Sequence, residues 1–399
     1  MRQDFRPTLV LSVVAFFVMM GISIIAPVLP SYALSFGVSL ALVGLLISAF
    51  AVARVLLDIP AGIFSSRFGM KRFMLIGLGI IAISSIAAGL ATDYTTLLVA
   101  RILEGIGSAL YTTTSITVIS KLAPRESRGA HLSFYLSMFL LGTAFGPAIG
   151  GTVSIYYGLS APFLVYGICG AVSFFMVFLW IADIRPTPEE AEKVTLRQLG
   201  RLIKRYDMVS INLATIAVFV VRQGILNTMV PLYAMYNLRI SEGLLGIVLT
   251  VSAVCNLAIM VVAGRLTDKY GRKPFLMAGL VLLAFLTILL PFTTDVVGLT
   301  IILMAMGFAI GLSDPIAAWV ADVAEPKDLG GAMGLFRTMG DLGFVIAPVA
   351  LASLAGQAGA EVGALPFVVA GIVVVALSMP LLRTRDPVAE RRNENSQSL

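Results

Sequence analysis

The chain has 399 residues, of which 58% are hydrophobic and only 13% are charged, with a formal net charge of +6. Soluble domains carry about 25% charged residues, so this composition excludes an ordinary soluble enzyme, a disordered chain and a nucleic-acid binder. A membrane-spanning helix needs about 20 apolar residues. The hydrophobic residues therefore suffice for about a dozen spans and leave little for a soluble domain.

Apolar runs long enough to cross a bilayer recur along the whole sequence. We expect them to be helices, because they are too long for barrel strands and a helix satisfies its own backbone within lipid. The first run exceeds the core of a signal peptide and lacks a clear cleavage site, so we expect it to be retained. The predicted spans are 9–30, 41–64, 73–91, 95–119, 130–155, 161–182, 208–232, 244–263, 275–291, 296–320, 331–355 and 362–382.

The positions of the basic residues predict the orientation of these spans. With the N-terminus inside the cell, 23 of the 28 Lys and Arg residues fall in cytoplasmic segments, and only Arg239 falls in an outer loop. Cytoplasmic loops of membrane proteins are enriched in Lys and Arg. We therefore predict a multi-pass protein of the cell (inner) membrane with both termini in the cytoplasm. This distribution also explains the positive charge without a nucleic-acid partner.

The longest predicted loop, 183–207, divides the chain into two halves. It begins with a proline-containing turn and continues with leucines at helical spacing between basic residues, which indicates an amphipathic helix on the membrane surface. The expected domains are an N-terminal six-helix bundle over 1–182, this linker, a C-terminal six-helix bundle over 208–382 and a cytoplasmic tail over 383–399.

The two halves repeat each other at an offset of about 201–202. Residues 30–33 match 231–234, and glycines of the second to fourth spans recur at the same spacing in the eighth to tenth. Six is an even number of spans, so both copies have the same polarity in the membrane. The sequence thus predicts an all-α membrane protein of two six-helix bundles, related by a pseudo-twofold axis along the membrane normal. Such bundles can rock around a site at the midplane.

The loops after the second and eighth spans share a pattern of glycine and basic residues. Its members are Gly62, Arg67, Gly69, Lys71 and Arg72 in the first loop, and Gly264, Asp268, Gly271, Arg272 and Lys273 in the second. Both resemble the G-x-x-x-D-[RK]-x-G-[RK]-[RK] loop of the major facilitator superfamily, although Ser66 replaces the aspartate in the first.

The resemblance implies that these loops act as conformational latches and that the protein has the major facilitator fold. We expect Asp268 to accept hydrogen bonds from a neighbouring helix N-terminus, with the fifth span near Gly129 as the candidate partner. Because Ser66 carries no charge, we expect a weaker latch in the first half.

A second motif lies in the fifth span. It comprises Gly142, Gly146, Pro147, Gly150 and Gly151. It resembles the G-x-x-x-G-P-x-x-G-G signature of the twelve-span drug:proton antiporter branch, and the segment 101–107 resembles that branch's R-x-x-x-G-x-G. Close helix packing is an alternative explanation for the glycines. The proline should also bend the helix.

Charged residues inside the predicted spans are functional candidates, because each costs at least about 2.5–3.5 kcal/mol on insertion scales. Three pairs can neutralise each other on one helix face, and structural ion pairing is the alternative reading for them. These pairs are Arg54 with Asp58, Arg101 with Glu104, and Arg337 with Asp341.

We rank Glu104, Asp314 and Asp341, in that order, as proton carriers. Glu104 comes first because its neighbour Arg101 matches the family's motif in the fourth span. Asp314 has no charged partner in its own helix and precedes a proline that should distort that helix. Arg222 and Asn227 of the seventh span complete the coupling or substrate candidates.

The motifs together imply secondary active transport by alternating access, namely proton-coupled efflux of amphipathic or drug-like molecules. A lipid or glycolipid flippase, a carrier of small sugar-like solutes and a non-transporting receptor are the alternatives. The first span has no acidic residue, unlike many multidrug antiporters, so the charge of the substrate stays open.

We expect no enzymatic activity, metal site or cofactor, and the transmembrane proton gradient is the expected energy source. The only histidine, His131, is expected at the surface, and the two cysteines lie in apolar runs. The expected partners are a small-molecule or lipid-like substrate, protons and the bilayer. The protein itself is expected to be a monomer.

Overall fold

The computed structural model describes residues 5–123, 127–182, 202–325, 328–388 and 390. Side chains at 59, 62–64, 66–68, 128 and 329–330 lie outside this description. All regular elements of the described residues are helical, and twelve segments of this part are long and apolar enough to cross a membrane. These findings confirm the predicted all-α fold with twelve spans. The linker helix expected within 183–207 falls mainly outside the described residues.

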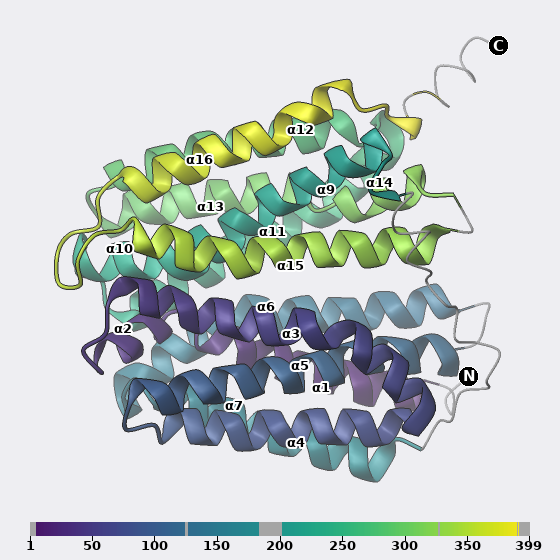
Figure 1. Cartoon of the computed structure of the whole chain (residues 1–399), viewed down its shortest axis with the longest axis horizontal. Coiled ribbons are helices and arrows are strands. Elements are labelled where there is room, and N and C mark those ends of the chain that lie inside the picture. The colour runs from purple at the N-terminus through teal and green to yellow at the C-terminus, as the bar shows by residue number, and fades with distance from the viewer. Residues whose placement is uncertain (1–4, 124–126, 183–201, 326–327, 389, 391–399) are drawn as a thin grey trace. The chain divides into compact units, whose positions relative to one another are not determined.

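The chain forms two compact units, which Figure 1 colours by residue number. The first comprises residues 1–192 and 240–250, and the second comprises 193–239 and 251–399. The elements of the first unit are α1 (Arg6–Ile24), α2 (Leu29–Leu34), α3 (Leu40–Phe68), α4 (Met70–Gly89), α5 (Tyr94–Leu122), α6 (Arg128–Tyr157), α7 (Ala161–Trp180) and the beginning of α11 (Glu242–Tyr270).

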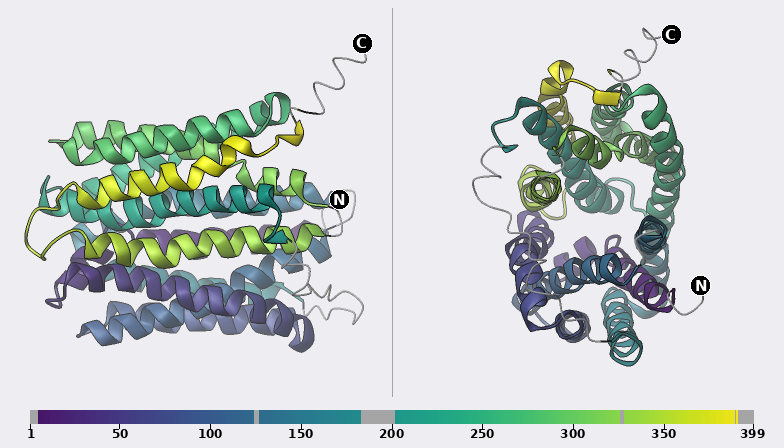
Figure 2. Two further views of the ribbon diagram at one scale, coloured as in Figure 1. Left: turned by 45° about the horizontal axis from the view of Figure 1, so that its top comes forward. Right: turned by 90° about the vertical axis from the view of Figure 1, so that its right-hand side faces the viewer.

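The second unit contains the rest of α11 and the helices on either side of it. Its elements are α9 (Tyr206–Phe219), the π-helix η2 (Val220–Met229), α10 (Val230–Tyr236), α12 (Lys273–Leu289), the 3₁₀-helix η3 (Leu290–Phe292), α13 (Val296–Ser313), α14 (Ile316–Val323), α15 (Leu329–Ser353), α16 (Leu365–Ser378) and the 3₁₀-helix η5 (Met379–Arg383). Within each unit the helices lie side by side, as the end-on view of Figure 2 shows.

The same devices begin and end helices in both units. Asp93 caps α5 and Asp295 caps α13, each accepting a hydrogen bond from the backbone N–H three residues ahead, at 2.8 and 2.7 Å. Gly69 and Gly271 separate consecutive spans with φ angles of +102° and +103°. A glycine tolerates this conformation, which a side chain would strain. Both pairs lie 202 residues apart, so the sequence repeat has a structural counterpart.

The packing of helices repeats as well. In the first unit α1 packs on α6 and α7, and α4 packs on α5 and α7. In the second unit the seventh span packs on α15 and α16, and α12 packs on α13 and α16. Each half of the sequence therefore folds with the same internal arrangement.

Two tyrosines make equivalent hydrogen bonds at corresponding positions of the two units. The Tyr32 hydroxyl donates to two backbone carbonyls at the end of α4, at 3.0 and 3.3 Å. The Tyr233 hydroxyl donates to two carbonyls after α12, at 3.0 and 2.6 Å. Their rings pack against Phe163 and Phe367, respectively, near the beginnings of the sixth and twelfth spans.

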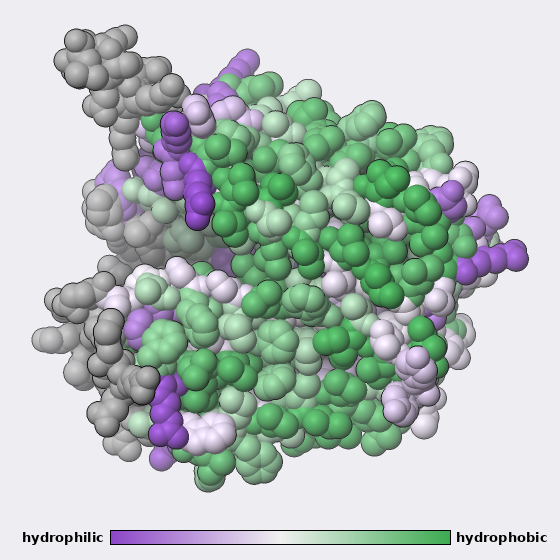
Figure 3. Space-filling view, turned by 180° about the vertical axis from the view of Figure 1, so that it is seen from behind, coloured by the Kyte–Doolittle hydropathy of each residue, from purple (hydrophilic) through white to green (hydrophobic). Residues whose placement is uncertain are grey.

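The surface of each unit suits a bilayer. Large apolar side chains such as Ile83, Phe175, Phe285 and Ile301 are exposed. In Figure 3 hydrophobic side chains cover the lengths of the helices, whereas hydrophilic ones gather near the helix ends. Such apolar area requires lipid rather than water around it. The chain is a multi-pass membrane protein.

Two prolines act differently on their helices. Pro147 lies inside α6, which continues unbroken from Arg128 to Tyr157. Pro315 lies where α13 ends and α14 begins, so it interrupts the helix as expected from the sequence. The seventh span has its own irregularity, because ten of its residues form η2. π-Helical turns are frequent at functional sites.

Candidate functional site

A fully enclosed ion pair lies in the first unit. Glu104 is 0% exposed and Arg101, which pairs with it, is 3% exposed. Ser85 of α4 donates its hydroxyl to the second carboxylate oxygen at 2.8 Å, and the guanidinium lies 4.6 Å from the ring centre of Phe50. The pair predicted from the three-residue spacing therefore forms, but both carboxylate oxygens are already engaged.

The surroundings of this pair are polar but closed. The Tyr166 hydroxyl of α7 is buried near both members of the pair. Within the described residues it has no hydrogen-bond partner, and neither has the Nε of Arg101. Neither Ser85 nor Tyr166 was predicted from the sequence, because an isolated hydroxyl in a span carries no distinctive signal.

A second charged cluster joins three spans of the second unit. Arg222 of η2 forms an ion pair with one carboxylate oxygen of Asp314, and Asn256 of α11 donates to the other at 2.8 Å. The side chains of Arg222 and Asp314 are 30% and 16% exposed. The sequence predicts both charges separately, and the structure brings them together with an asparagine that sequence reasoning missed.

The backbone around this cluster is irregular on two sides. Arg222 lies in the wide turns of η2, and Asp314 lies between α13 and α14. Asn227, also in η2, donates to the side chain of Gln223 at 2.7 Å rather than to the cluster. Transporter sites often lie where membrane helices are interrupted. The partly exposed carboxylate of Asp314 lies at such an interruption.

The remaining predicted charge pairs lie on α3 and α15. Arg54 and Asp58 form an ion pair with 4.0 Å between Nε and Oδ2, and Thr113 of α5 donates to Asp58 at 3.0 Å. Arg337 and Asp341 share α15, where Asp341 is buried with 3% exposure.

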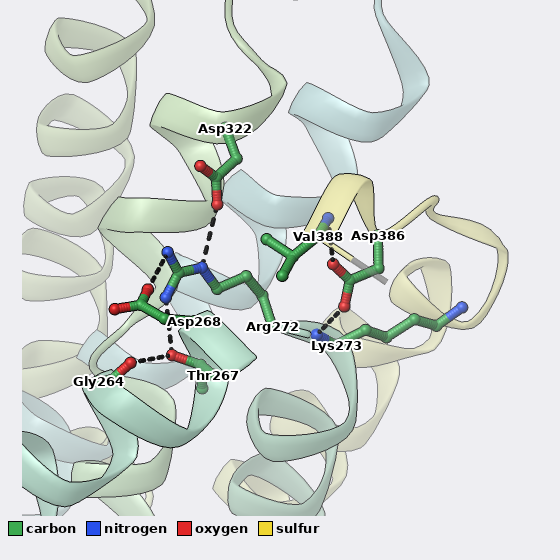
Figure 4. A network of polar contacts seen from close by, with 8 residues as sticks. All are labelled: Gly264, Thr267, Asp268, Arg272, Lys273, Asp322, Asp386 and Val388. Carbon is green, nitrogen blue, oxygen red and sulfur yellow. Dashed lines mark hydrogen bonds and ion pairs between the residues drawn. The ribbon is translucent and has the colours of Figure 1, made fainter. Parts of the chain in front are cut away.

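The loop between α11 and α12 forms the polar network in Figure 4. Arg272 lies at its centre and is 9% exposed. Its guanidinium forms ion pairs with Asp268 at 2.6 Å and Asp322 at 3.0 Å, and it donates to the Thr267 hydroxyl at 2.7 Å. That hydroxyl donates in turn to the carbonyl of Gly264 at 2.9 Å. The network ties the end of α11 to α14, and Asp322 is a member that the motif did not predict.

The corresponding loop of the first unit is described in part. The backbones of Gly62 and Arg67 belong to α3, but the side chains of Ser66 and Arg67 lie outside the description. Lys71 donates to the carbonyl of Phe178 at the end of α7, at 2.8 Å, and Arg72 is exposed.

The glycine motif of the fifth span packs against α1. A Cβ atom on Gly142, Gly146 or Gly150 would overlap the backbone of α1. The residues around Pro147 and Gly151 meet the beginning of α11, which belongs to the same unit. The motif therefore serves close helix packing, as the alternative reading of its glycines holds.

The expected surface position of His131 is wrong. Its side chain is 5% exposed, and its Nδ1 shares a hydrogen bond of 2.6 Å with the Thr8 hydroxyl of α1. The ring also packs edge-on against Phe5, with 4.9 Å between ring centres. The residue lies at a helix beginning, as expected, but α1 covers that beginning.

The sequence model of the Major Facilitator Superfamily matches residues 11–233 and again residues 211–398. The chain belongs to this superfamily. The two matches cover the two halves, in agreement with the internal repeat.

Individual relatives are transporters too. An uncharacterized MFS-type transporter of Methanocaldococcus jannaschii is 28% identical, with 88% of this chain and 91% of the relative covered. The synaptic vesicular amine transporter of Rattus norvegicus is 25% identical, with 87% of this chain and 67% of the relative covered. A bacterial homologue of the human lysosomal transporter Spinster has the same fold, with a TM-score of 0.79, 16% identity and 96% of each chain covered.

The protein is thus a secondary transporter of the Major Facilitator Superfamily and not an enzyme. Among the described residues, no group of three or more His, Cys, Asp or Glu side chains is arranged to hold a metal ion.

Proposed function

We propose that this transporter exports amphipathic molecules in exchange for protons, and that Asp314 binds the proton or the substrate in alternation. The transmembrane proton gradient supplies the energy. The observation that carries this proposal is the cluster of Arg222, Asp314 and Asn256, in which a partly exposed carboxylate lies between interrupted helices.

The chemistry of the cluster suits an exchange. A charged Asp314 holds the Arg222 guanidinium, whereas a protonated Asp314 loses the ionic part of that attraction. A cationic substrate competes with both the proton and Arg222 for the same carboxylate. Loading one ligand therefore favours release of another, as antiport requires.

Exposure favours Asp314 over Glu104 as the exchanging acid. Both carboxylates are bound on each oxygen, but the Asp314 side chain is 16% exposed, whereas that of Glu104 is fully enclosed. A proton can reach Glu104 only if its surroundings move. This argument reverses the first two places in the order that the sequence motif favoured.

The substrate class that we infer is amines. Asp314 supplies a negative charge inside a span, and a relative of 25% identity is named as a vesicular amine transporter. The glycine motif of α6, which resembles that of drug:proton antiporters, supports export as the direction. Ethidium, an amphipathic cation with a fluorescent readout, is a suitable probe.

The test is ethidium transport in proteoliposomes with and without an imposed pH gradient. Asp314→Asn is expected to abolish gradient-driven accumulation while ethidium still equilibrates downhill. Glu104→Gln and Asp341→Asn are compared in the same assay, and Asp295→Asn, an exposed helix cap of the same unit, is the matched control. Full gradient-driven accumulation by Asp314→Asn contradicts its assigned role. Movement of a labelled lysolipid or sugar instead of ethidium favours the alternative substrates.

A further inference from the structure

The segment Leu382–Val388, which comprises the end of the last span and the residues after it, docks on the loop between α11 and α12. Asp386 is 8% exposed although it lies close to the chain end. One of its carboxylate oxygens accepts the backbone N–H of Lys273 at 2.8 Å, and the other accepts the N–H of Val388 at 3.1 Å. The carboxylate therefore joins the beginning of α12 to the docked segment, as Figure 4 shows.

The side chain of Lys273 also contacts the docked segment. Its ammonium group donates to the carbonyls of Leu382 at 2.7 Å and Thr384 at 3.1 Å. The same residue thus gives its backbone N–H to the segment's carboxylate and its side chain to the segment's carbonyls. We call these four hydrogen bonds of Asp386 and Lys273 the clasp.

The clasp lies directly beside Arg272, the centre of the polar network between α11 and α14. Arg272 precedes Lys273, and its guanidinium contacts Asp268, Asp322 and Thr267. Gly271, on the other side of Arg272, has a φ angle of +103°, a conformation that glycine reaches without strain. The backbone next to Arg272 is therefore held from the α12 side, by a carboxylate at a helix N-terminus where negative charge is favourable.

We propose that Asp386 is a positioning residue of the transport cycle, which acts through the beginning of α12 to hold Arg272 against Asp268 and Asp322. This role concerns the loop alone, so it does not depend on the substrate or on proton coupling.

Among the described residues, the first unit has a contact that corresponds to the lysine side of the clasp. Lys71, 202 residues before Lys273, donates to the carbonyl of Phe178 at the end of the sixth span, at 2.8 Å. The lysine contact therefore belongs to the repeated fold.

The experiment is a double-mutant cycle read by electron spin resonance distances. Spin labels are placed at Leu122 and Arg265, both exposed, after Cys169 and Cys255 are replaced by serine. Arg272→Ala and Asp386→Ala are expected to shift the populations of the distance distribution in the same direction, each about fivefold, the size of one lost hydrogen bond. The double variant is expected to shift no further than Arg272→Ala, because the two residues act as one unit.

Three comparisons separate positioning from a purely structural effect. Asp386→Glu is expected to restore the wild-type distribution, and Asp386→Asn, which retains one acceptor oxygen, to give an intermediate shift and to serve if the alanine variant fails to fold. Asp295→Ala removes a cap from α13 and is expected to add independently to Arg272→Ala. Additive effects of Asp386→Ala and Arg272→Ala, or a wild-type distribution in both Asp386→Ala and Asp386→Asn, overturn the proposal.

Discussion

Glu104 and Asp314 show how differently two carboxylates can be held within one membrane protein. Each pairs with an arginine, but Glu104 lies inside the first unit with no exposure, whereas Asp314 is partly exposed at a break between helices. A buried ion pair recovers its desolvation cost only through good geometry and further hydrogen bonds. The enclosed pair is therefore expected to matter for stability, and the exposed pair for exchange.

Removing Arg101 is expected to destabilise the protein strongly. Arg101→Leu leaves the buried Glu104 without its counter-charge, which costs about 3–5 kcal/mol in comparable buried pairs. Thermal unfolding followed by tryptophan fluorescence measures the loss. The double variant Arg101→Leu with Glu104→Leu is expected to recover much of it, because no uncompensated charge remains. Equal melting temperatures for Arg101→Leu and the wild type contradict this account.

The sequence predicted the first of these pairs but not the second. Arg101 and Glu104 are three residues apart, so helical periodicity alone places them together. Arg222 and Asp314 are separated by 92 residues, and their contact depends on helix packing that one sequence does not encode locally. Asn256 and Ser85 are uncharged, so their presence inside apolar runs gave only a weak signal.

At the scale of elements, α6 depends on its small residues. Gly142, Gly146 and Gly150 lie along one side of the helix and allow α1 to approach. This periodicity of four residues is visible in the sequence, which is why close packing could be proposed from it. The π-helix of the seventh span had no such signature, because its wide turns arise from packing rather than from a local motif.

Substitution of Gly146 provides the corresponding prediction. In Gly146→Ala the new methyl group would lie 2.7 Å from the carbonyl oxygen of Met20, so α1 and α6 must separate. Overpacking of this kind costs about 1–3 kcal/mol. Gly334→Ala in α15, where nothing lies within 4 Å, is the matched control and should be neutral or stabilising. Melting temperatures in detergent distinguish the two, and equal values for both variants contradict the packing role.

At the scale of the whole molecule, the repeated sequence gives two units with the same internal helix packing. The number of spans, their helical nature and the repeat were predictable, because apolar length and glycine spacing are local properties. The buried position of His131 was not, since it depends on α1 lying over the beginning of α6. The clasp at Asp386 was also missed, because a single aspartate after the last span resembles any polar tail residue.

The repeat predicts matched effects of matched substitutions. Tyr32→Phe and Tyr233→Phe each remove a hydroxyl that donates to two carbonyls. Each is expected to cost about 0.5–1.5 kcal/mol, the net value of an intramolecular hydrogen bond. Because the two sites lie in separate units, their effects on the unfolding free energy should add in the double variant. A large departure from additivity would falsify the independence of the two sites.

The second latch loop carries a prediction about conformational populations. Asp268→Asn removes the charge that pairs with Arg272, and we expect it to increase the inward-open population and slow transport without loss of expression. Distances between the Leu122 and Arg265 labels report the populations. In the first loop, Ser66→Asp supplies the missing charge and is expected to have the opposite effect. An unchanged distribution in Asp268→Asn counts against a latch.

Proton movement driven by substrate tests the central claim most directly. Proteoliposomes that contain a trapped pH-sensitive dye receive external ethidium without any imposed pH gradient. Antiport predicts that ethidium entry drives protons out, so the lumen becomes more alkaline, and that Asp314→Asn removes this change while Asp295→Asn preserves it. Ethidium entry with no change in luminal pH, or with acidification of the lumen, would contradict proton antiport.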